Sequence, residues 1–160
     1  KMNPTGLVPT IDDDGFTLWE SHSIVRYLCA KHSAGKLWPT DLEVRADAEH
    51  WMDWAFSFQN AMRNVFWGLI RTPPEKRDAK AIEEGCKKSA ELLKVLEAGL
   101  TGKQYVTGSN FTMGDIPIGC EVQRWMRVPI EHPPFPNVQA WFERLRGRVP
   151  FVKHVDLPLS

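Results

Sequence analysis

The sequence predicts a small α/β part, made of a β-hairpin and one helix, followed by a larger all-α domain. Two short apolar runs, 5–11 and 16–19, flank the dipeptide Asp14-Gly15, and Asp-Gly supplies the positive φ angles of a tight hairpin. Directly afterwards the apolar spacing changes from two to about 3.6 residues, the period of a helix. One stripe of that helix is formed by Ile24, Val25, Leu28 and Cys29. From residue 42 onward the apolar residues keep mainly to helical spacing.

Composition limits the class of protein. The 160 residues are 42% hydrophobic and 25% charged, which is enough for one substantial core. Lys+Arg and Asp+Glu balance at 20 each, so no basic field attracts nucleic acid or an acidic membrane, and we expect neither partner. No apolar run approaches the ~20 residues of a membrane span, and no signal region is recognisable. A cytoplasmic location is therefore expected.

We expect no metal site. The three cysteines are Cys29, Cys86 and Cys120. They lie far apart in the sequence, on or beside helical apolar stripes, and this placement indicates reduced thiols packed in the interior. The five histidines lack metal-ligand spacing and are expected at the surface or as capping residues: His22, His32, His50, His132 and His154. The acidic run 12–14 with Gly15 hints at a calcium loop, but the required spacing would start that loop at Thr10 and put Ser21 where a bidentate Glu belongs. A solvated turn is the better interpretation.

Glu20 and Ser21 stand where the hairpin leads into the helix. The free N–H groups and the positive dipole end of a helix N-terminus favour a carboxylate, and the Ser21 hydroxyl can add a hydrogen bond. Glu20 could hold an ammonium. Such a pair suits an amino-acid head group that carries both charges. The alternative is that Ser21 simply caps its helix.

Three short motifs carry a resemblance: Asn3-Pro4-x-Gly6-x-Val8-Pro9, Leu18-Trp19-Glu20-Ser21 and Ile24-x-Arg26-Tyr27-Leu28. They resemble the second half of the thioredoxin-like, glutathione-binding domain of cytosolic glutathione S-transferases, closest to bacterial theta- or beta-like members. The resemblance implies a cis Val8-Pro9 bond, pairing of the Val8 backbone with the cysteinyl part of glutathione, and binding of the γ-glutamyl end by Glu20 and Ser21. Glutathione would be a co-substrate, and no other cofactor is expected.

The resemblance also implies what the chain lacks. About a quarter of a usual family member, a strand, a helix and a strand, would lie upstream of Lys1. That piece would contain the Ser, Tyr or Cys near the glutathione sulfur, so we expect no catalytic residue in this chain. Many theta- and delta-like members have a His at the position of Gly6 and an Arg at that of His22, and both contact glutathione.

The remaining chain reads as helices. We expect the thioredoxin-like part over 1–34, a linker over 35–41 with Gly35 and Pro39, and an all-α C-terminal domain over 42–160. A long helix opens that domain, with one face formed by Val44, Ala48, Trp51, Ala55, Phe58, Met62, Val65 and Leu69. In the family that the chain resembles, the equivalent helix lines the pocket for the electrophile. The resemblance therefore implies such a use for Trp54, Phe58 and Trp67, with core or dimer packing as the alternative.

Two capping boxes are predicted. Thr72-Pro73-Pro74-Glu75 has the spacing to restart a helix, and Thr112 with Asp115 has it again further on. In the resembling family the second motif begins the central helix of the C-terminal domain, so Thr112 and Asp115 are expected to be structural. A final helix from Pro136 would bury Val138, Trp141, Phe142 and Leu145, and the tail 149–159 would lie against the surface.

The resemblance therefore implies a glutathione S-transferase that joins the glutathione thiol to hydrophobic electrophiles and forms a homodimer. A non-catalytic module of the same fold, used for binding or assembly, is the alternative.

Overall fold

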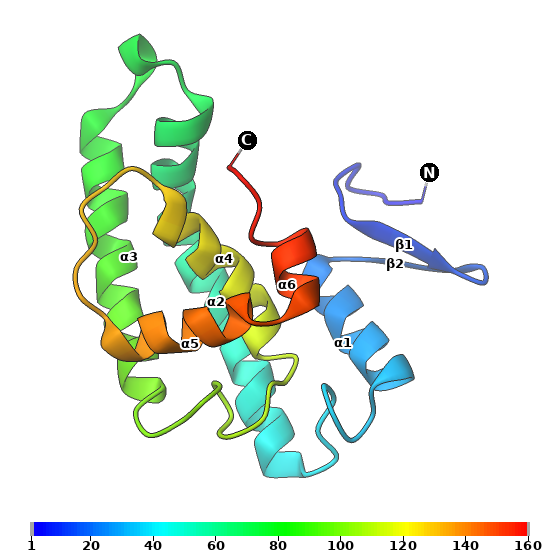
Figure 1. Cartoon of the computed structure of the whole chain (residues 1–160). Helices are drawn as coiled ribbons and strands as arrows, with labels where there is room; N and C mark the ends of the chain where they lie inside the picture. Colours follow the sequence, from blue (N-terminus) through cyan, green and yellow to red (C-terminus); the bar gives the residue numbers. More distant parts are fainter. Residues whose placement is uncertain (1, 160) are drawn as a thin grey trace.

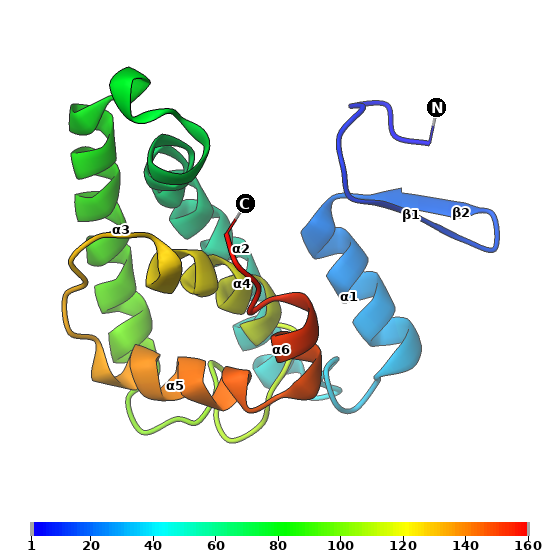
Figure 2. The ribbon, with the colours of Figure 1, turned by 45° about the horizontal axis from the view of Figure 1, so that its top comes forward.

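The computed structural model describes residues 2–159. It has a two-stranded antiparallel sheet with one adjoining helix, and a larger bundle of helices beside them (Figures 1 and 2). The elements in chain order are β1 (Thr10–Asp13), β2 (Phe16–Trp19), α1 (Ser21–His32), α2 (Leu42–Phe66), the π-helical turn η1 (Trp67–Arg71), the 3₁₀ turn η2 (Pro74–Lys76), α3 (Ala79–Gly99), α4 (Asp115–Arg127), α5 (Pro136–Arg146) and α6 (Val149–His154).

The predicted hairpin is confirmed. Its register runs from Thr10 opposite Trp19 to Asp13 opposite Phe16. The two turn residues, Asp14 and Gly15, have φ angles of 52° and 90°, the left-handed region that this turn needs. The turn bends the chain so that β2 leads directly into α1.

The acidic turn between β1 and β2 contacts side chains of α1. The Asp13 carboxylate accepts hydrogen bonds from the Tyr27 hydroxyl and the Lys31 ammonium of α1. Lys31 foremost, and Tyr27 next, hold the pKa of Asp13 below its usual value. Within residues 2–159 no three His, Cys, Asp or Glu side chains gather as a metal site would require.

The helix predicted after the hairpin is confirmed as α1, and it packs on α2. A small apolar cluster joins the two parts of the molecule: Cys29 on α1, Ala48 and Met52 on α2, and Met113. Arg26 forms an ion pair with Asp53 of α2. These contacts fix the orientation of α1 on the helical part.

The expectation of a surface or capping role is wrong for His22. Its ring stacks on Phe56 of α2 with 3.9 Å between centroids, and only 8% of the residue is exposed. The reason is the packing of α1 on α2, which places the face that carries His22 against an aromatic side chain. Burial, followed by the nearby Arg26 charge, lowers the pKa of His22.

The main core lies between the helices of the larger part, where α2 and α3 run side by side and α4 packs against α2 (Figures 1 and 2). Most of the predicted stripe of α2 is buried, namely Ala48, Trp51, Ala55, Phe58, Met62 and Val65. Val44 is exposed and Leu69 is only partly buried, because they lie at the two ends of the stripe. The stripe prediction is otherwise confirmed.

The capping box predicted at Thr72 is wrong. Residues 74–76 form only η2, and α3 begins at Ala79 after Asp78, whose carboxylate accepts from the Ala81 N–H over 3.0 Å. The Arg77 side chain donates to the carbonyls of Leu69 and Thr72, and thereby ties the connection to the end of η1. Helix α3 therefore begins only after Arg77, the residue that these two hydrogen bonds hold in place.

The second predicted capping box is half formed. Asp115 Oδ2 accepts from the Thr112 N–H over 2.9 Å, as a capping box requires. The Thr112 hydroxyl, however, bonds the hydroxyl of Thr107 at 3.3 Å and does not cap α4. Asp115 Oδ1 accepts two further bonds, from the Val106 N–H and the Trp141 indole. The carboxylate is therefore the centre of a buried network.

The C-terminal part agrees with the sequence. All four residues predicted to face inward from α5 are buried. The tail packs on the surface but contains α6, whose Phe151 contacts the core. Asp156 then pairs with Arg127 of α4 and Arg146 of α5, which anchors the end of the chain.

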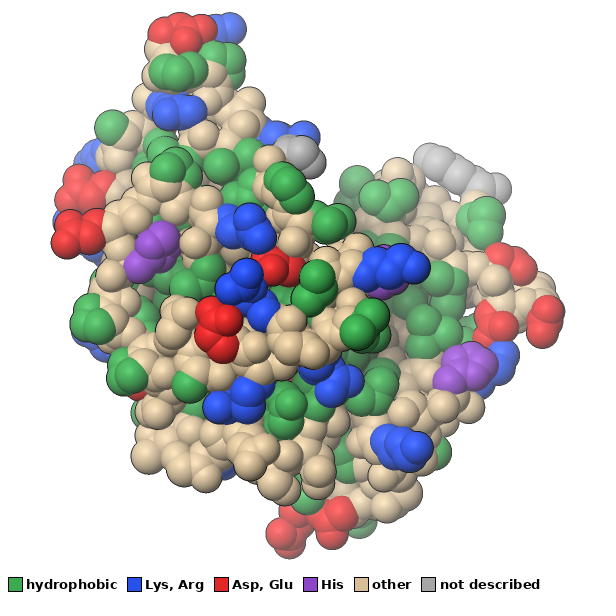
Figure 3. Space-filling model, in the orientation of Figure 1, with side chains coloured by type: hydrophobic (Ala, Val, Ile, Leu, Met, Phe, Trp, Pro, Cys, Tyr) green, Lys and Arg blue, Asp and Glu red, His purple; other side chains and the backbone are tan. Residues whose placement is uncertain are grey.

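Figure 3 shows positive and negative side chains interleaved over the visible face, as the balanced composition predicts. The three cysteines are free thiols. Among residues 2–159 no helix combines the length and apolar character needed to cross a membrane.

Candidate functional site

The hairpin brings together the two halves of the predicted peptide site. Because Thr10 is opposite Trp19, the segment Val8-Pro9 and the segment Glu20-Ser21 leave the sheet at the same end. Both therefore lie beside the N-terminus of α1. The surface is hollowed between this region and the helical part (Figure 3).

Val8 presents its backbone to solvent. The Val8-Pro9 bond is cis, as predicted, and Val8 is 92% exposed. Within residues 2–159 no hydrogen bond is made by its N–H or C=O group. An extended peptide ligand can pair with such an unoccupied backbone edge.

Asn3 shapes the loop before Val8, a role that the sequence interpretation missed. Its side-chain amide donates to the Leu7 carbonyl over 2.7 Å, and its Oδ1 accepts from the N–H and the hydroxyl of Thr5. Asn3 is only 8% exposed. Asparagine commonly bonds the backbone two residues on, so the Asn-Pro dipeptide was the available signal.

Glu20 has an unusual backbone conformation. Its φ of 71° and ψ of 113° lie outside the regions that non-glycine residues normally adopt. Such conformations cost about 1–3 kcal/mol and concentrate at functional sites. The side chain of Glu20 is exposed and makes no hydrogen bond within the described part of the chain.

Ser21 is the first residue of α1 and is exposed. Its hydroxyl makes no hydrogen bond among residues 2–159, so the structure gives it no capping role. The first N–H groups of α1 have no carbonyl partners within the helix. A negatively charged group placed there would meet these donors and the hydroxyl together.

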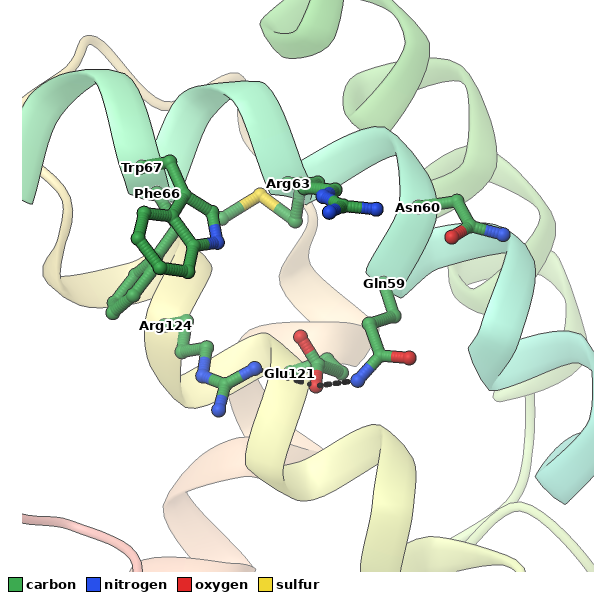
Figure 4. A pocket seen from close by; sticks show the side chains of 8 residues that line it. Gln59, Asn60, Arg63, Phe66, Trp67, Glu121 and Arg124 are labelled. Carbon is green, nitrogen blue, oxygen red and sulfur yellow. Dashed lines mark hydrogen bonds and ion pairs between the residues drawn. The ribbon is translucent and has the colours of Figure 1, made fainter. Parts of the chain in front are cut away.

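A pocket of about 250 Å³ lies further along α2 (Figure 4). It is formed between the end of α2, the start of η1 and α4, and it is lined by Gln59, Asn60, Met62, Arg63, Phe66, Trp67, Glu121 and Arg124. The rings of Phe66 and Trp67 lie at one end, and the bond from Gln59 to Glu121 at the other. π-Helical turns such as η1 are frequent at functional sites.

The pocket follows the same face of α2 that meets α1. Phe56, Asn60, Arg63 and Trp67 recur at intervals of four, three and four, which keeps them on one side of the helix. A helix rises 1.5 Å per residue, so Arg63 lies about 10 Å along the axis from Phe56. Phe56 supports His22, the neighbour of Ser21, so the pocket lies along α2 from the start of α1.

Of the three aromatic residues predicted for an electrophile pocket, Trp67 lines this one and is 57% exposed. The prediction for Phe58 is wrong, because the helical core buries it completely, parallel to Trp54 at 5.8 Å. Trp54 packs against the same core and is not among the lining residues. Core packing, the stated alternative, accounts for both.

The polar lining residues were missed because they lie between the apolar stripes of α2 and α4. The spacing of Gln59, Arg63 and Trp67, four residues each, was the signal in the sequence. Glu121, which interrupts the apolar face of α4 and is 7% exposed, was another. A buried carboxylate such as that of Glu121 needs hydrogen-bond partners, and Gln59 and Arg124 provide them.

The cysteines do not supply a reactive thiolate. Burial raises the pKa of the thiols of Cys29 and Cys86, and it raises that of Cys120 to about 11. All three remain protonated at neutral pH. None of these three cysteines is therefore a candidate nucleophile.

Two family models match the chain. The model of the glutathione S-transferase N-terminal domain matches residues 1–36, and that of the glutathione S-transferase C-terminal domain matches residues 58–148. Among curated proteins, the chain is similar to glutathione S-transferase GstB of Escherichia coli, with 42% identity over 162 residues, 99% of this chain and 78% of that protein. Glutathione S-transferase F13 of Arabidopsis thaliana is 31% identical over 96% of this chain and 74% of its own length.

Solved structures agree. The theta class glutathione S-transferase of Xanthomonas axonopodis pv. citri, crystallised with glutathione bound, superposes with a TM-score of 0.96 at 42% identity, and the match covers 99% of this chain and 77% of that one. Glutathione S-transferase-I with lactoylglutathione superposes with a TM-score of 0.86 at 27% identity, covering 97% and 76%. This chain belongs to the glutathione S-transferase family.

Proposed function

We propose that the protein conjugates the thiol of glutathione to hydrophobic electrophiles. The observation that carries the proposal is the convergence of Val8, Glu20 and Ser21 at one end of the hairpin, next to the N-terminus of α1. Glutathione has a peptide backbone and a γ-glutamyl end with an ammonium and a carboxylate, and the Val8 backbone, Glu20 and Ser21 are complementary to these three groups. The glutathione-bound relative supports the same ligand.

Each site residue has a distinct role in this proposal. The backbone of Val8, bent by Pro9, pairs with the cysteinyl part of glutathione. The Glu20 carboxylate binds the γ-glutamyl ammonium, and the Ser21 hydroxyl with the first N–H groups of α1 binds the γ-glutamyl carboxylate. These contacts position the sulfur, and the pocket of Figure 4 receives the electrophile.

The reaction is a nucleophilic substitution or addition by the glutathione thiolate, so a lowered thiol pKa is the essential step.

Residues 1–34 form the glutathione-binding part, 35–41 the linker and 42–160 the helical part in this proposal. The protein functions in the cytoplasm as a homodimer.

Binding and conjugation are tested separately. Calorimetric titration of the complete gene product with glutathione should give saturable binding, and the tripeptide with α-linked glutamate should bind more weakly because its ammonium and carboxylate are displaced. Conjugation of chlorodinitrobenzene by the complete gene product should be saturable in glutathione. Binding without conjugation would favour a non-catalytic binding module, and failure of both would reject the proposal.

A further inference from the structure

The charges of the pocket in Figure 4 do not cancel. Two guanidinium groups and one carboxylate line it, from Arg63, Arg124 and Glu121. Glu121 Oε1 accepts from Arg124 over 2.8 Å and from the Gln59 amide over 3.3 Å. The charge of Arg124 is thereby balanced by Glu121, which lines the same pocket.

Arg63 supplies the surplus charge. Within residues 2–159 its guanidinium makes no ion pair and no hydrogen bond, and the residue is exposed. It projects from α2 on the side of the pocket opposite Arg124 of α4 (Figure 4). A planar guanidinium with free donors matches a carboxylate better than any neutral group.

An aromatic wall stands beside these charges. Phe66 has the Arg124 guanidinium over its ring at 5.3 Å and the Arg71 guanidinium at 5.9 Å, so this ring already interacts with two cations of the protein. Trp67, at the same end of the pocket, is a residue with 57% of its surface exposed. Trp67 therefore offers free aromatic surface for stacking with a flat ligand.

We infer that this pocket selects electrophiles that combine a flat ring with a carboxylate, the ring lying on Trp67 and the carboxylate on Arg63. The inference rests on the proposed function and names the substrate class of its second site. A volume of about 250 Å³ is small for a ligand pocket and suits a single ring with short substituents. Arg63 is a substrate-binding residue here and takes no part in bond making.

A pair of matched electrophiles isolates the charge. With 4-(chloromethyl)benzoate, the glutathione sulfur lone pair forms the C–S bond at the benzylic carbon. The C–Cl bond breaks, chloride leaves with the bonding electrons, and the thiol proton passes to buffer. The neutral 4-(chloromethyl)benzamide reacts by the same steps. The measured quantity is the ratio of kcat/KM for the two compounds in the complete gene product.

We expect the carboxylate to be preferred at least tenfold. Arg63→Gln should remove most of this preference by lowering kcat/KM for the carboxylate, and Arg63→Lys should restore part of it. Glu121→Gln should increase the preference, because it releases Arg124 from its partner. Lys80→Gln, which removes a positive charge from an exposed position on α3, is the matched control and should change nothing.

Binding provides a readout that does not need conjugation. In this chain, titration with unreactive 4-methylbenzoate should shift the NMR signal of the Trp67 indole N–H, identified by its loss in Trp67→Phe, and 4-methylbenzamide should not. Equal shifts from both probes, or a carboxylate preference that survives Arg63→Gln, would overturn the inference. An Arg63→Gln variant that raises the KM for glutathione would also overturn it, since the arginine would then bind glutathione.

Discussion

Asp115 of α4 accepts a hydrogen bond from the Trp141 indole of α5 over 2.8 Å, and both side chains are completely buried. The same carboxylate accepts from the N–H groups of Val106 and Thr112. One side chain therefore joins the start of α4, the loop before it and the middle of α5. Burial raises the pKa of Asp115, and the three N–H donors oppose that effect.

Removing this carboxylate should be costly. Asp115→Ala leaves three buried donors unpaired, at about 1–3 kcal/mol each, so we expect a loss above ~3 kcal/mol in the free energy of unfolding. Trp141→Phe removes one bond and should cost ~1 kcal/mol beyond the change in packing. Urea unfolding measures both. Thr112→Val, which removes only the contact with the Thr107 hydroxyl, is the control, and an equal loss from it would refute the network.

The glutathione head-group site is tested by Ser21→Ala and Glu20→Gln in the complete gene product. Each change removes one charge-assisted contact, so each should weaken glutathione binding by ~1.5–3 kcal/mol in calorimetry. Ser23→Ala, two residues into the same helix and also exposed, should leave the affinity unchanged. Unchanged affinity in both site variants would place the γ-glutamyl end elsewhere.

Gly114 lets the loop before α4 approach α2. A Cβ atom at this position would lie 3.0 Å from both the Cα and the carbonyl oxygen of Ala48, and backbone atoms cannot give way cheaply. Gly114→Ala should therefore cost ~1–3 kcal/mol. In Gly147→Ala the nearest atom belongs to the last turn of α5, so thermal unfolding should show a change below ~1 kcal/mol. Similar values for the two variants would show that the α2 contact is unimportant.

The sequence predicted the elements whose signals are local. The Asp-Gly turn and the stripes of α2 and α5 depend on spacing within one element, and the structure confirms them. The capping box at Thr72 failed although its local pattern is sound. Two hydrogen bonds from Arg77 hold that connection, and Arg77 acts on carbonyls that no local pattern identifies.

For the candidate site, too, the sequence indicated the residues with a local signal and missed those that depend on helix packing. Glu20 and Ser21 stand at a boundary that periodicity marks, so they could be selected from the sequence. The pocket between α2 and α4 joins residues about 60 positions apart, such as Gln59 and Glu121, and their contact depends on how the helices pack. For Phe58 the aromatic character was evident, but only packing decides whether a ring faces the core or a cavity.

His22 should make the attachment of α1 sensitive to acid. Its pKa in the folded chain lies below the unfolded value of about 6.5, because burial against Phe56, and then the Arg26 charge, disfavour the imidazolium. The groups that face it are Arg26 and Asp53, which pair with each other. A lowered pKa means that the unfolded chain binds the proton more readily. The stabilisation is therefore complete above about pH 6.5 and declines as the pH falls below it.

The variant His22→Phe keeps an aromatic ring on Phe56 and cannot titrate. Between pH 7.5 and pH 5.5, the wild-type free energy of unfolding should decrease by more than that of the variant, as measured by urea unfolding at each pH. The difference arises because only wild type must exclude a proton from the buried ring. Parallel curves for the two proteins over this range would mean that His22 keeps its ordinary affinity for protons, and the acid sensitivity would then belong to other groups.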